Sequence, residues 1–326
     1  MSYKAKIVLD SVSECGDRLT TMEVRFPRFV LAEFNTHRVF TRNSGSSRAI
    51  PFKKLIGGIV SSPFVPDYWG ANQSGMQANE QIDDEKRILA VEDWLKVRDA
   101  VVGTAVDLDS LGVHKQTVNR LLEPFMWHTV VVTSTEWDNF FALRANPDAQ
   151  PEIRTIAEMM QALYEESNPQ EVLDDQWHQP FIGVTKDRTE YESEEAWLHA
   201  TKNAATERQW AAENPNDATK VSIARCARVS YLTHDGKREI SADLTLYNRL
   251  ENGGHLSPFE HVARPFTNGE RRLLSGMTSA LDNFADTFDV DDLFTEQVRQ
   301  SLEFCGNFRG WRQARKMMTN EAVFPG

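Results

Sequence analysis

The chain has 326 residues, a formal net charge of −12 and 40% hydrophobic residues. This length allows one large domain or two ordinary ones, and the apolar content predicts a folded chain with a sizeable core. The acidic balance argues against a protein that coats duplex DNA, because such proteins use Lys and Arg to neutralise phosphates. It still permits a small anionic ligand held by a few local arginines.

The three cysteines predict a reducing compartment. Cys15, Cys226 and Cys305 are widely spaced and form no CxxC motif, so a disulfide framework is not expected. The first residues lack the apolar core of a signal peptide, and no stretch approaches the roughly 20 apolar residues of a membrane span. The eight histidines show no metal-ligand spacing. We therefore predict a cytoplasmic protein without membrane contact or a bound metal.

The first predicted elements are two half-buried strands. Polar and apolar residues alternate over 4–9 and again over 19–26, as is typical of strands with one buried face. Pro27 ends the second strand. Helical spacing then follows as far as His37, and a loop of small polar residues is expected at Thr41–Ser47.

The middle of the chain is mostly helical by its apolar spacing. Residues 80–106 carry the strongest pattern, with an apolar stripe that includes Ile88 and Leu89. Further helices are expected at 114–123 and 151–166, around a buried strand at 130–132. Thr135 and Asp138 resemble a capping box that would open one more helix between them.

The remaining part of the chain begins with an acidic segment. Residues 167–220 read as a surface insertion with one helix near 193–212. A helix over 241–252 is expected to end at Gly253 and Gly254, and the basic segment 309–316 is helix-like.

One basic segment stands out as a candidate anion site. Thr36–Arg48 reads THRVFTRNSGSSR and combines three arginines and three serines with one glycine. Guanidinium groups, hydroxyls and backbone N–H groups of such a loop can hold a phosphate. A solvated basic loop is an equally good interpretation of these residues alone.

Three further segments are less specific by themselves. Arg228–Tyr231 taken alone is an ordinary polar surface strand, and Asn139–Asn146 offers core side chains followed by Arg144. In GHLSPFEH, which spans Gly254–His261, Ser257 and Glu260 fit the ends of a capping box. That helix start could also face an anionic ligand.

Together these segments resemble the flavin-dependent thymidylate synthases. The family motif is close to RHRxxSxNxxSxR, and Thr36–Arg48 is similar to it. Its ARVSF/Y segment is matched by Ala227–Tyr231, its GHxTPFEH segment by Gly254–His261, and its NFLNLRA segment by Asn139–Ala145. Gly112–Pro124 resembles the family helix that carries an arginine, which places Arg120 there.

The order of the motifs differs from that of the family. There the ARVSY and HxTPFEH segments precede the HR motif, whereas here they follow it. A circular permutation would produce this order, and permutation is tolerated when the original termini lie close together on the surface. We expect one catalytic domain, 1–326, in which 167–220 joins the HR-motif part, 1–166, to the second part, 221–326.

The resemblance implies a fold, a reaction and an assembly. The fold would be α+β, with a mixed β-sheet flanked by helices and an acidic helical insertion. The reaction would be reductive methylation of dUMP at C5 to dTMP, with methylenetetrahydrofolate as the carbon source and NADPH restoring reduced FAD. The assembly would be a homotetramer with active sites between subunits.

The resemblance also implies roles for individual residues. Arg144 would contact the base and act in catalysis. The nucleotide would also be held by Glu33, Ser46, Ser47, Arg48 and Arg120. The flavin would be lined by Thr36, His37, Arg38, Asn43, Ser44, Asn139, Ser230, His255, Ser257 and Glu260.

Departures from the family motif leave alternatives open. Thr36 replaces the first Arg of the motif, Ser44 the Glu, and Ser47 the Gly, while Glu33 stands where the family has Gln. Glu33 could favour another pyrimidine nucleotide such as dCMP, or a hydroxymethylating reaction. The loss of the arginine at Thr36 and the basic segment 309–316 also allow a non-catalytic nucleotide- or nucleic-acid-binding protein.

Overall fold

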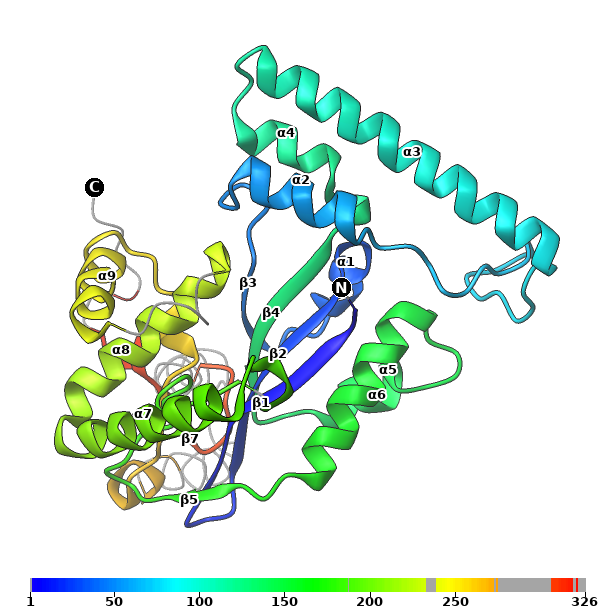
Figure 1. Cartoon of the computed structure of the whole chain (residues 1–326). Helices are drawn as coiled ribbons and strands as arrows, with labels where there is room; N and C mark the ends of the chain where they lie inside the picture. Colours follow the sequence, from blue (N-terminus) through cyan, green and yellow to red (C-terminus); the bar gives the residue numbers. More distant parts are fainter. Residues whose placement is uncertain are drawn as a thin grey trace, which may run out of the picture.

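The computed structural model describes residues 2–186, 188–232, 239–272, 274, 306–318 and 321. At its centre lies a five-stranded sheet in the order β3-β4-β2-β1-β5 (Figure 1). Its strands are β1 (Lys4–Ser13), β2 (Arg18–Pro27), β3 (Thr41–Ser44), β4 (Trp127–Ser134) and β5 (Gln170–Val172). The strands expected at 4–9, 19–26 and 130–132 are confirmed, and each is longer than its apolar pattern.

The sheet is mixed because its last strand runs parallel to its neighbour. β1 pairs with β5 in parallel, whereas β1–β2, β2–β4 and β3–β4 are antiparallel. The expected loop over Thr41–Ser47 is partly wrong, because Thr41–Ser44 forms β3 at the sheet edge. Its polar residues pair with Val130–Thr133 of β4, so backbone hydrogen bonds, rather than apolar side chains, hold this strand.

Helices α5 (Asp138–Arg144) and α6 (Pro151–Glu166) cover one face of the sheet (Figure 1). Alternate residues of β2 and β4, among them Met22 and Val130, share a buried cluster with Ile153 and Ile156 of α6. This two-residue alternation was visible in the sequence. The capping box expected at the start of α5 is wrong, because Trp137 is the N-cap and no side chain caps this helix.

The other face packs against α8 (Pro215–Arg228) and carries a buried polar chain. Thr21 Oγ1 lies 2.8 Å from His178 Nε2 and 2.7 Å from Thr133 Oγ1. Thr133 Oγ1 in turn lies 2.7 Å from His261 Nδ1. These hydrogen bonds connect His178 to β2 and His261 to β4, two neighbouring strands. They therefore fix the segment that ends in His261 against β4.

A helical group lies at one end of the sheet, formed by α2 (Phe52–Ser61), α3 (Asp84–Ser110) and α4 (Lys115–Leu121) (Figure 1). The long helix expected at 80–106 is confirmed as α3. Its apolar stripe is not buried as an amphipathic pattern would suggest, since Ile88 is 58% exposed and Leu89 60%. α3 contacts the rest of the chain mainly near its C-terminal half, through residues such as Ala105.

Three helices form the opposite end: α7 (Glu194–Glu213), α8 and α9 (Ile240–Asn252) (Figure 1). The helix expected near 193–212 is confirmed, but 167–220 also contains β5 and the start of α8. The fully buried Arg225 joins the group, with ion pairs to Asp243 of α9 at 2.9 Å and to Glu207 of α7. The segment 167–220 is therefore integrated into the fold along its length, through β5 and His178 in its first half and through Glu207 in its second.

Short elements follow α9, and two expectations fail there. Residues Ser257–Glu260 form a 3-10 helix, η5, without a side-chain cap, so the capping box expected at Ser257 is wrong. The basic segment 309–316 is not an α-helix. It contains β7 (Trp311–Gln313), paired with β6 (Ala263–Pro265), and continues into a 3-10 helix, η6 (Ala314–Met317). The remaining short elements are η1 (Arg28–Val30), α1 (Leu31–Phe34), η2 (Glu123–Phe125), η3 (Arg188–Glu190) and η4 (Val229–Tyr231).

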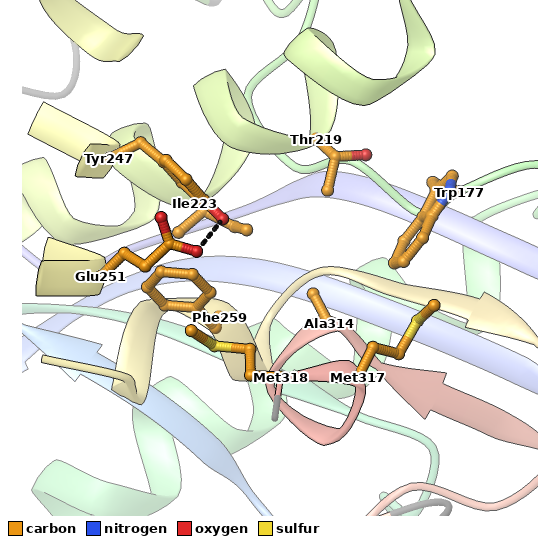
Figure 2. A pocket seen from close by; sticks show the side chains of 9 residues that line it. All are labelled: Trp177, Thr219, Ile223, Tyr247, Glu251, Phe259, Ala314, Met317 and Met318. Carbon is orange, nitrogen blue, oxygen red and sulfur yellow. Dashed lines mark hydrogen bonds between the residues drawn. The ribbon is translucent and has the colours of Figure 1, made fainter. Parts of the chain in front are cut away.

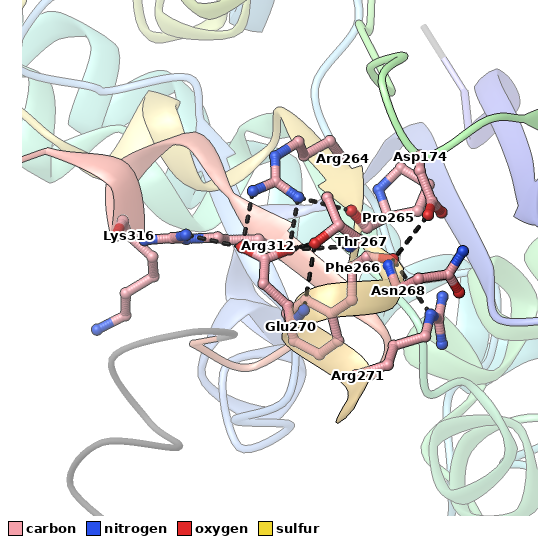
Figure 3. Close-up of polar contacts among 10 residues, drawn as sticks. All are labelled: Asp174, Arg264, Pro265, Phe266, Thr267, Asn268, Glu270, Arg271, Arg312 and Lys316. Carbon is pink, nitrogen blue, oxygen red and sulfur yellow. Dashed lines mark hydrogen bonds and ion pairs between the residues drawn. The ribbon is translucent and has the colours of Figure 1, made fainter. Parts of the chain in front are cut away.

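An ion-pair cluster holds this segment in place (Figure 3). Glu270 accepts two hydrogen bonds of 2.7 Å from Arg264 and one of 2.8 Å from Arg312. These guanidinium groups and the Thr267 N–H lower the pKa of Glu270 to about 2. Arg312 belongs to β7 and Arg264 to β6, so the carboxylate reinforces the pairing of the two strands.

The expected fold class, an α+β fold with a mixed sheet flanked by helices, is confirmed. No helix among the described residues is long and apolar enough to cross a membrane. Within the same residues, no group of three or more His, Cys, Asp or Glu side chains could hold a metal ion. Cys226 is buried, and burial raises the pKa of its thiol; Cys305 lies outside the described residues.

Candidate functional site

A large cavity, of about 1140 Å³, lies where β3, α4, α8, α9 and η5 meet. Its walls come from four parts of the sequence, within 42–49, 114–116, 227–231 and 246–258. They are Arg42, Asn43, Ser44, Ser46, Arg48, Ala49, His114, Lys115, Gln116, Ala227, Arg228, Ser230, Tyr231, Leu246, Arg249, Leu250, Gly253, His255, Ser257 and Pro258. Seven of the residues named from the sequence alone are among them, namely Asn43, Ser44, Ser46, Arg48, Ser230, His255 and Ser257.

The cavity is cationic in a chain that is acidic overall. Arg42, Arg48, Lys115, Arg228 and Arg249 line it, and no Asp or Glu is among the described residues on its walls. Hydroxyl groups and an amide are interspersed between these cations. Such a set fits an anion with several oxygen acceptors, because guanidinium groups hold phosphate oxygens in forked pairs of hydrogen bonds.

Backbone contacts hold the basic loop in the cavity wall. The Ser46 N–H donates to the Ser230 carbonyl at 3.0 Å, and the Gly45 N–H donates to the Thr129 carbonyl at 2.9 Å. A Cβ at Gly45 would lie 3.2 Å from a methyl group of Leu232. The loop after β3 and the Ala227–Tyr231 segment are thus in direct contact, although more than 180 residues separate them in the sequence.

α4 fixes the far end of the same loop. Asn119, which is fully buried, donates through Nδ2 to the carbonyls of Ser47 at 2.6 Å and Ile50 at 3.0 Å. Lys115 Nζ donates to the Ala49 carbonyl at 2.9 Å. The exposed guanidinium of Arg48 is therefore presented on a loop whose backbone is anchored on both sides.

A buried carboxylate orients Arg228 in the wall. Asp243 accepts from Arg228 Nε at 2.7 Å and from Arg225 Nε at 2.9 Å, and its side chain is fully buried. Arg228 stands at the C-terminal end of α8, just before η4. The polar surface strand considered for Arg228–Tyr231 is wrong, since these residues end a helix and Val229 is buried.

A glycine turn brings His255 to the cavity. α9 ends at Asn252, and Gly254 adopts a φ of 65°, which is unfavourable for other residues. The His255 N–H then donates to the Leu250 carbonyl at 2.9 Å. The expected C-cap at Gly253 and Gly254 is confirmed, and the turn places His255 and Ser257 beside Ser230.

A second group of predicted residues lies around His37 and does not line the cavity. Arg144 Nε donates to His37 Nε2 at 3.1 Å, and Arg144 Nη2 donates to Thr36 Oγ1 at 3.3 Å. His37 is buried edge-on against Phe140. Burial, with Arg144 and Arg42 nearby, lowers the pKa of His37 to about 4, so its ring is neutral at pH 7 and accepts from Arg144.

Arg42 connects the His37 group to the cavity. Arg42 Nη1 donates to the His37 carbonyl at 3.3 Å and the Phe34 carbonyl at 3.4 Å, and the same residue lines the cavity. The two groups of predicted residues therefore adjoin through one arginine. Arg38 and Asn139 lie on the exposed surface near this group.

Three other predicted residues are held in separate contacts, and a fourth, Glu33, has a carboxylate oxygen without one among the described residues. Glu123 accepts from Ser47 Oγ at 2.6 Å and pairs with Arg120 at 3.1 Å. Glu260 pairs with Arg315 of η6. Glu33 has a buried carboxylate oxygen, Oε2, that has no hydrogen-bond partner among the described residues.

Sequence reasoning missed several residues of the cavity. The residues not assigned to the site are His114, Lys115, Gln116, Arg228 and Arg249. Arg228 was missed although it lies inside a recognised motif. Lys115 and Arg249 lie on ordinary amphipathic helices, where a lone basic residue carries no signal. Their position at the cavity follows only from the packing of α4 and α9 around the loop.

One family model matches part of the chain. Residues 18–170, slightly less than half of the chain, match the family model described as thymidylate synthase complementing protein. This region contains the Thr36–Arg48 loop, α4 and the Asn139–Ala145 segment. The resemblance drawn from the motifs is therefore confirmed in this region. The segments Ala227–Tyr231 and Gly254–His261 lie outside the matched residues.

Solved structures with similar folds include two of a UMP/dUMP methylase, PolB, from Streptomyces cacaoi. The one bound with 5-Br dUMP is 15% identical with a TM-score of 0.42, and the match covers 51% of this chain and 90% of that chain. The one bound with 5-Br UMP is also 15% identical, with a TM-score of 0.43 and coverages of 51% and 89%. No curated protein matches the sequence.

Proposed function

We propose that the protein methylates dUMP at C5 to form dTMP, using reduced FAD as hydride donor, methylenetetrahydrofolate as carbon donor and NADPH as reductant. The proposal is supported most by the cationic cavity, which brings Asn43–Arg48 together with Ser230, His255 and Ser257. These are the motif residues that a permuted order separates in the sequence. The cofactors supply the redox chemistry, and the protein supplies position and electrostatics.

The residues of the cavity fit a flavin dinucleotide. Its volume of about 1140 Å³ is at or above the range of about 300–1,000 Å³ typical of ligand sites. Asn43, Ser230, His255 and Ser257 would line the flavin, and the arginines would hold its phosphates. Because five cations share one cavity, two phosphate groups can be neutralised there without a metal ion.

Arg144 is the proposed catalytic residue. Its guanidinium is oriented by the neutral ring of His37 and by Thr36. A cation held in this way would stabilise negative charge on the pyrimidine when N3 loses its proton, more than it stabilises the neutral ring. Arg144 pairs with a histidine rather than a carboxylate, so its positive charge is not neutralised by this contact.

We also propose that the active site is completed in a homotetramer. The His37 group and the cationic cavity adjoin in one subunit, but Arg120, Arg144 and Asn139 do not line that cavity. A neighbouring subunit would bring these side chains to its nucleotide. Light scattering should give the mass of four chains, and a monomer at micromolar concentration would contradict this proposal.

The second candidate is the same chemistry on another pyrimidine nucleotide such as dCMP, with a methyl or hydroxymethyl product. It is favoured by Glu33, whose buried Oε2 lacks a donor. A buried carboxylate oxygen that lacks a hydrogen-bond donor would accept a hydrogen bond from the amino group of cytosine.

The test of both candidates is product analysis. The purified protein, loaded with FAD, is incubated with methylenetetrahydrofolate, NADPH and either dUMP or dCMP. Formation of dTMP supports the first candidate, and a C5-modified cytidine nucleotide supports the second. A protein that cannot be loaded with FAD, or that gives neither product, would instead favour a non-catalytic nucleotide-binding or nucleic-acid-binding role. The proposed cytoplasmic localisation is tested separately, by cell fractionation.

A further inference from the structure

A second, smaller cavity lies against α9, on a different face of the helix from the cationic cavity (Figure 2). Its volume is about 350 Å³, and it is lined by Trp177, Thr219, Ile223, Tyr247, Glu251, Phe259, Ala314, Met317 and Met318. α9 and η5 contribute residues to both cavities. This volume suits a small ring system rather than a nucleotide.

Two aromatic walls face each other across the cavity. Tyr247 and Phe259 form a tilted pair with ring centroids 5.2 Å apart. Trp177 stands on the opposite side of the cavity, and the flexible side chains of Met317 and Met318 close it from below (Figure 2). Aromatic and thioether groups of this kind favour a flat, polarisable ring between them.

One charged group faces this apolar space. Glu251 accepts a hydrogen bond of 3.0 Å at Oε1 from the Tyr247 hydroxyl. Its carboxylate receives no other side-chain hydrogen bond from the described residues. The Thr219 hydroxyl is already engaged with Pro215 and Gln179. The second oxygen of Glu251 is therefore the charged acceptor left to meet a ligand, and it requires an N–H or O–H donor.

We propose that this second cavity binds a planar nitrogen heterocycle, with its ring between Trp177 and the Tyr247–Phe259 pair and an N–H group donating to Glu251. A fatty acid or another anion is disfavoured because the carboxylate would repel it. A purely apolar ring would displace water from Glu251 without replacing its hydrogen bond. The proposal does not depend on the reaction carried out at the cationic cavity.

Calorimetric titration of the full-length protein with 2-aminobenzimidazole tests the proposal. We expect saturable binding, at least tenfold weaker binding in Glu251→Gln, and a similar loss for 1-methylbenzimidazole, which has no N–H donor. Loss of one hydrogen bond to a charged group accounts for roughly this change. Trp177→Leu should also weaken binding, because one aromatic wall is removed.

Controls separate this cavity from the cationic one and from effects on folding. Glu195→Gln on the exposed face of α7 and Arg48→Ala should bind the probe like the wild-type protein. Melting temperatures identify variants that fail to fold, and Tyr247→Phe then serves as a milder substitute, with several-fold weaker binding expected. No saturable binding by the wild type, equal affinity in folded Glu251→Gln, or equal binding of n-butylamine would overturn the proposal.

Discussion

At the scale of single residues, the arginines of the site differ in what holds them. Arg48 projects from an anchored loop into the cationic cavity, whereas Arg120 is about half exposed and pairs with Glu123. Arg144 lies against a histidine whose pKa is lowered to about 4. The proposed roles therefore lead to separate predictions for binding and for turnover.

We predict that Arg48→Ala weakens nucleotide binding about tenfold or more while leaving the fold intact. A charge-assisted hydrogen bond contributes about 1.5–3 kcal/mol, and about 1.4 kcal/mol corresponds to a tenfold change in affinity. Calorimetric titration with dUMP measures the effect, with Arg154→Ala on the outer face of α6 as the control.

Arg120→Ala should weaken binding only if a neighbouring subunit brings Arg120 to the nucleotide. Unchanged affinity in the Arg48 and Arg120 variants would show that both residues belong to a solvated surface.

We predict that Arg144→Ala lowers turnover far more than it lowers stability. The fixed guanidinium would stabilise charge that develops only during the reaction, and Lys lacks the planar fork that reaches His37 and the base together, so Arg144→Lys should also be impaired. Single-turnover oxidation of the reduced flavin, with saturating nucleotide and folate, gives the rate, and the melting temperature gives the stability. A folded Arg144→Ala variant with undiminished oxidation and product formation would rule out catalysis by this residue.

At the scale of elements, the site depends on contacts between helices that are distant in sequence. Asp243 of α9 holds Arg225, which secures α7 and α8, and Arg228, which lines the cavity. This single carboxylate links the packing of three helices to the position of a cation. Burying these ion pairs costs desolvation free energy, but removing one partner strongly destabilises the fold because it leaves a buried charge unpaired.

We predict that Asp243→Asn destabilises the protein by about 3–5 kcal/mol, because Arg225 and Arg228 each lose a buried ion pair, although Arg225 keeps its pair with Glu207. The exposed carboxylate of Asp217, paired with Lys220 on α8, is the matched control, and Asp217→Asn should change stability by about 0–1 kcal/mol. Urea unfolding measures both. Nucleotide affinity should fall in Asp243→Asn under conditions where it is folded, and equal stability of the two variants would contradict this account.

At the scale of the whole molecule, neutral histidines hold the sheet to the segments that cross it. Burial lowers the pKa of His178 and His261 to about 3, and the pKa of His128 is lowered similarly by burial and Arg28. In the unfolded chain these rings would have a pKa near 6.5. The unfolded state therefore takes up protons first as the pH falls.

We predict that stability decreases as the pH falls from about 6.5 towards 3, since each buried ring must be neutral in the folded protein. Loss of the Glu270 ion pairs adds to this decrease below about pH 4.5, because its folded pKa is about 2. Urea unfolding between pH 7.5 and 4 measures the slope. His178→Gln should make it shallower, and exposed His199→Gln should not; a wild-type stability that is independent of pH would refute the prediction.

The sequence by itself determined many of the local elements. Strands 4–9 and 19–26, the helix at 151–166 and the end of α9 at Gly253–Gly254 follow from periodicity, proline and glycine, which act over a few residues. Caps were less predictable. Thr135 and Ser257 both precede a suitable acidic residue, yet neither caps a helix, because tertiary packing produces a different start for α5 and a four-residue 3-10 helix at η5.

Only the tertiary structure decided which of the predicted residues meet. Ser46 and Ser230 are joined by a backbone hydrogen bond, and Arg48 and His255 line one cavity, although the motifs that contain them stand in the reverse of the family order. Lys115, Arg228 and Arg249 join them without a motif of their own. The physical reason is that periodicity records which face of an element is buried, whereas the neighbours of a side chain depend on how distant helices pack around the sheet.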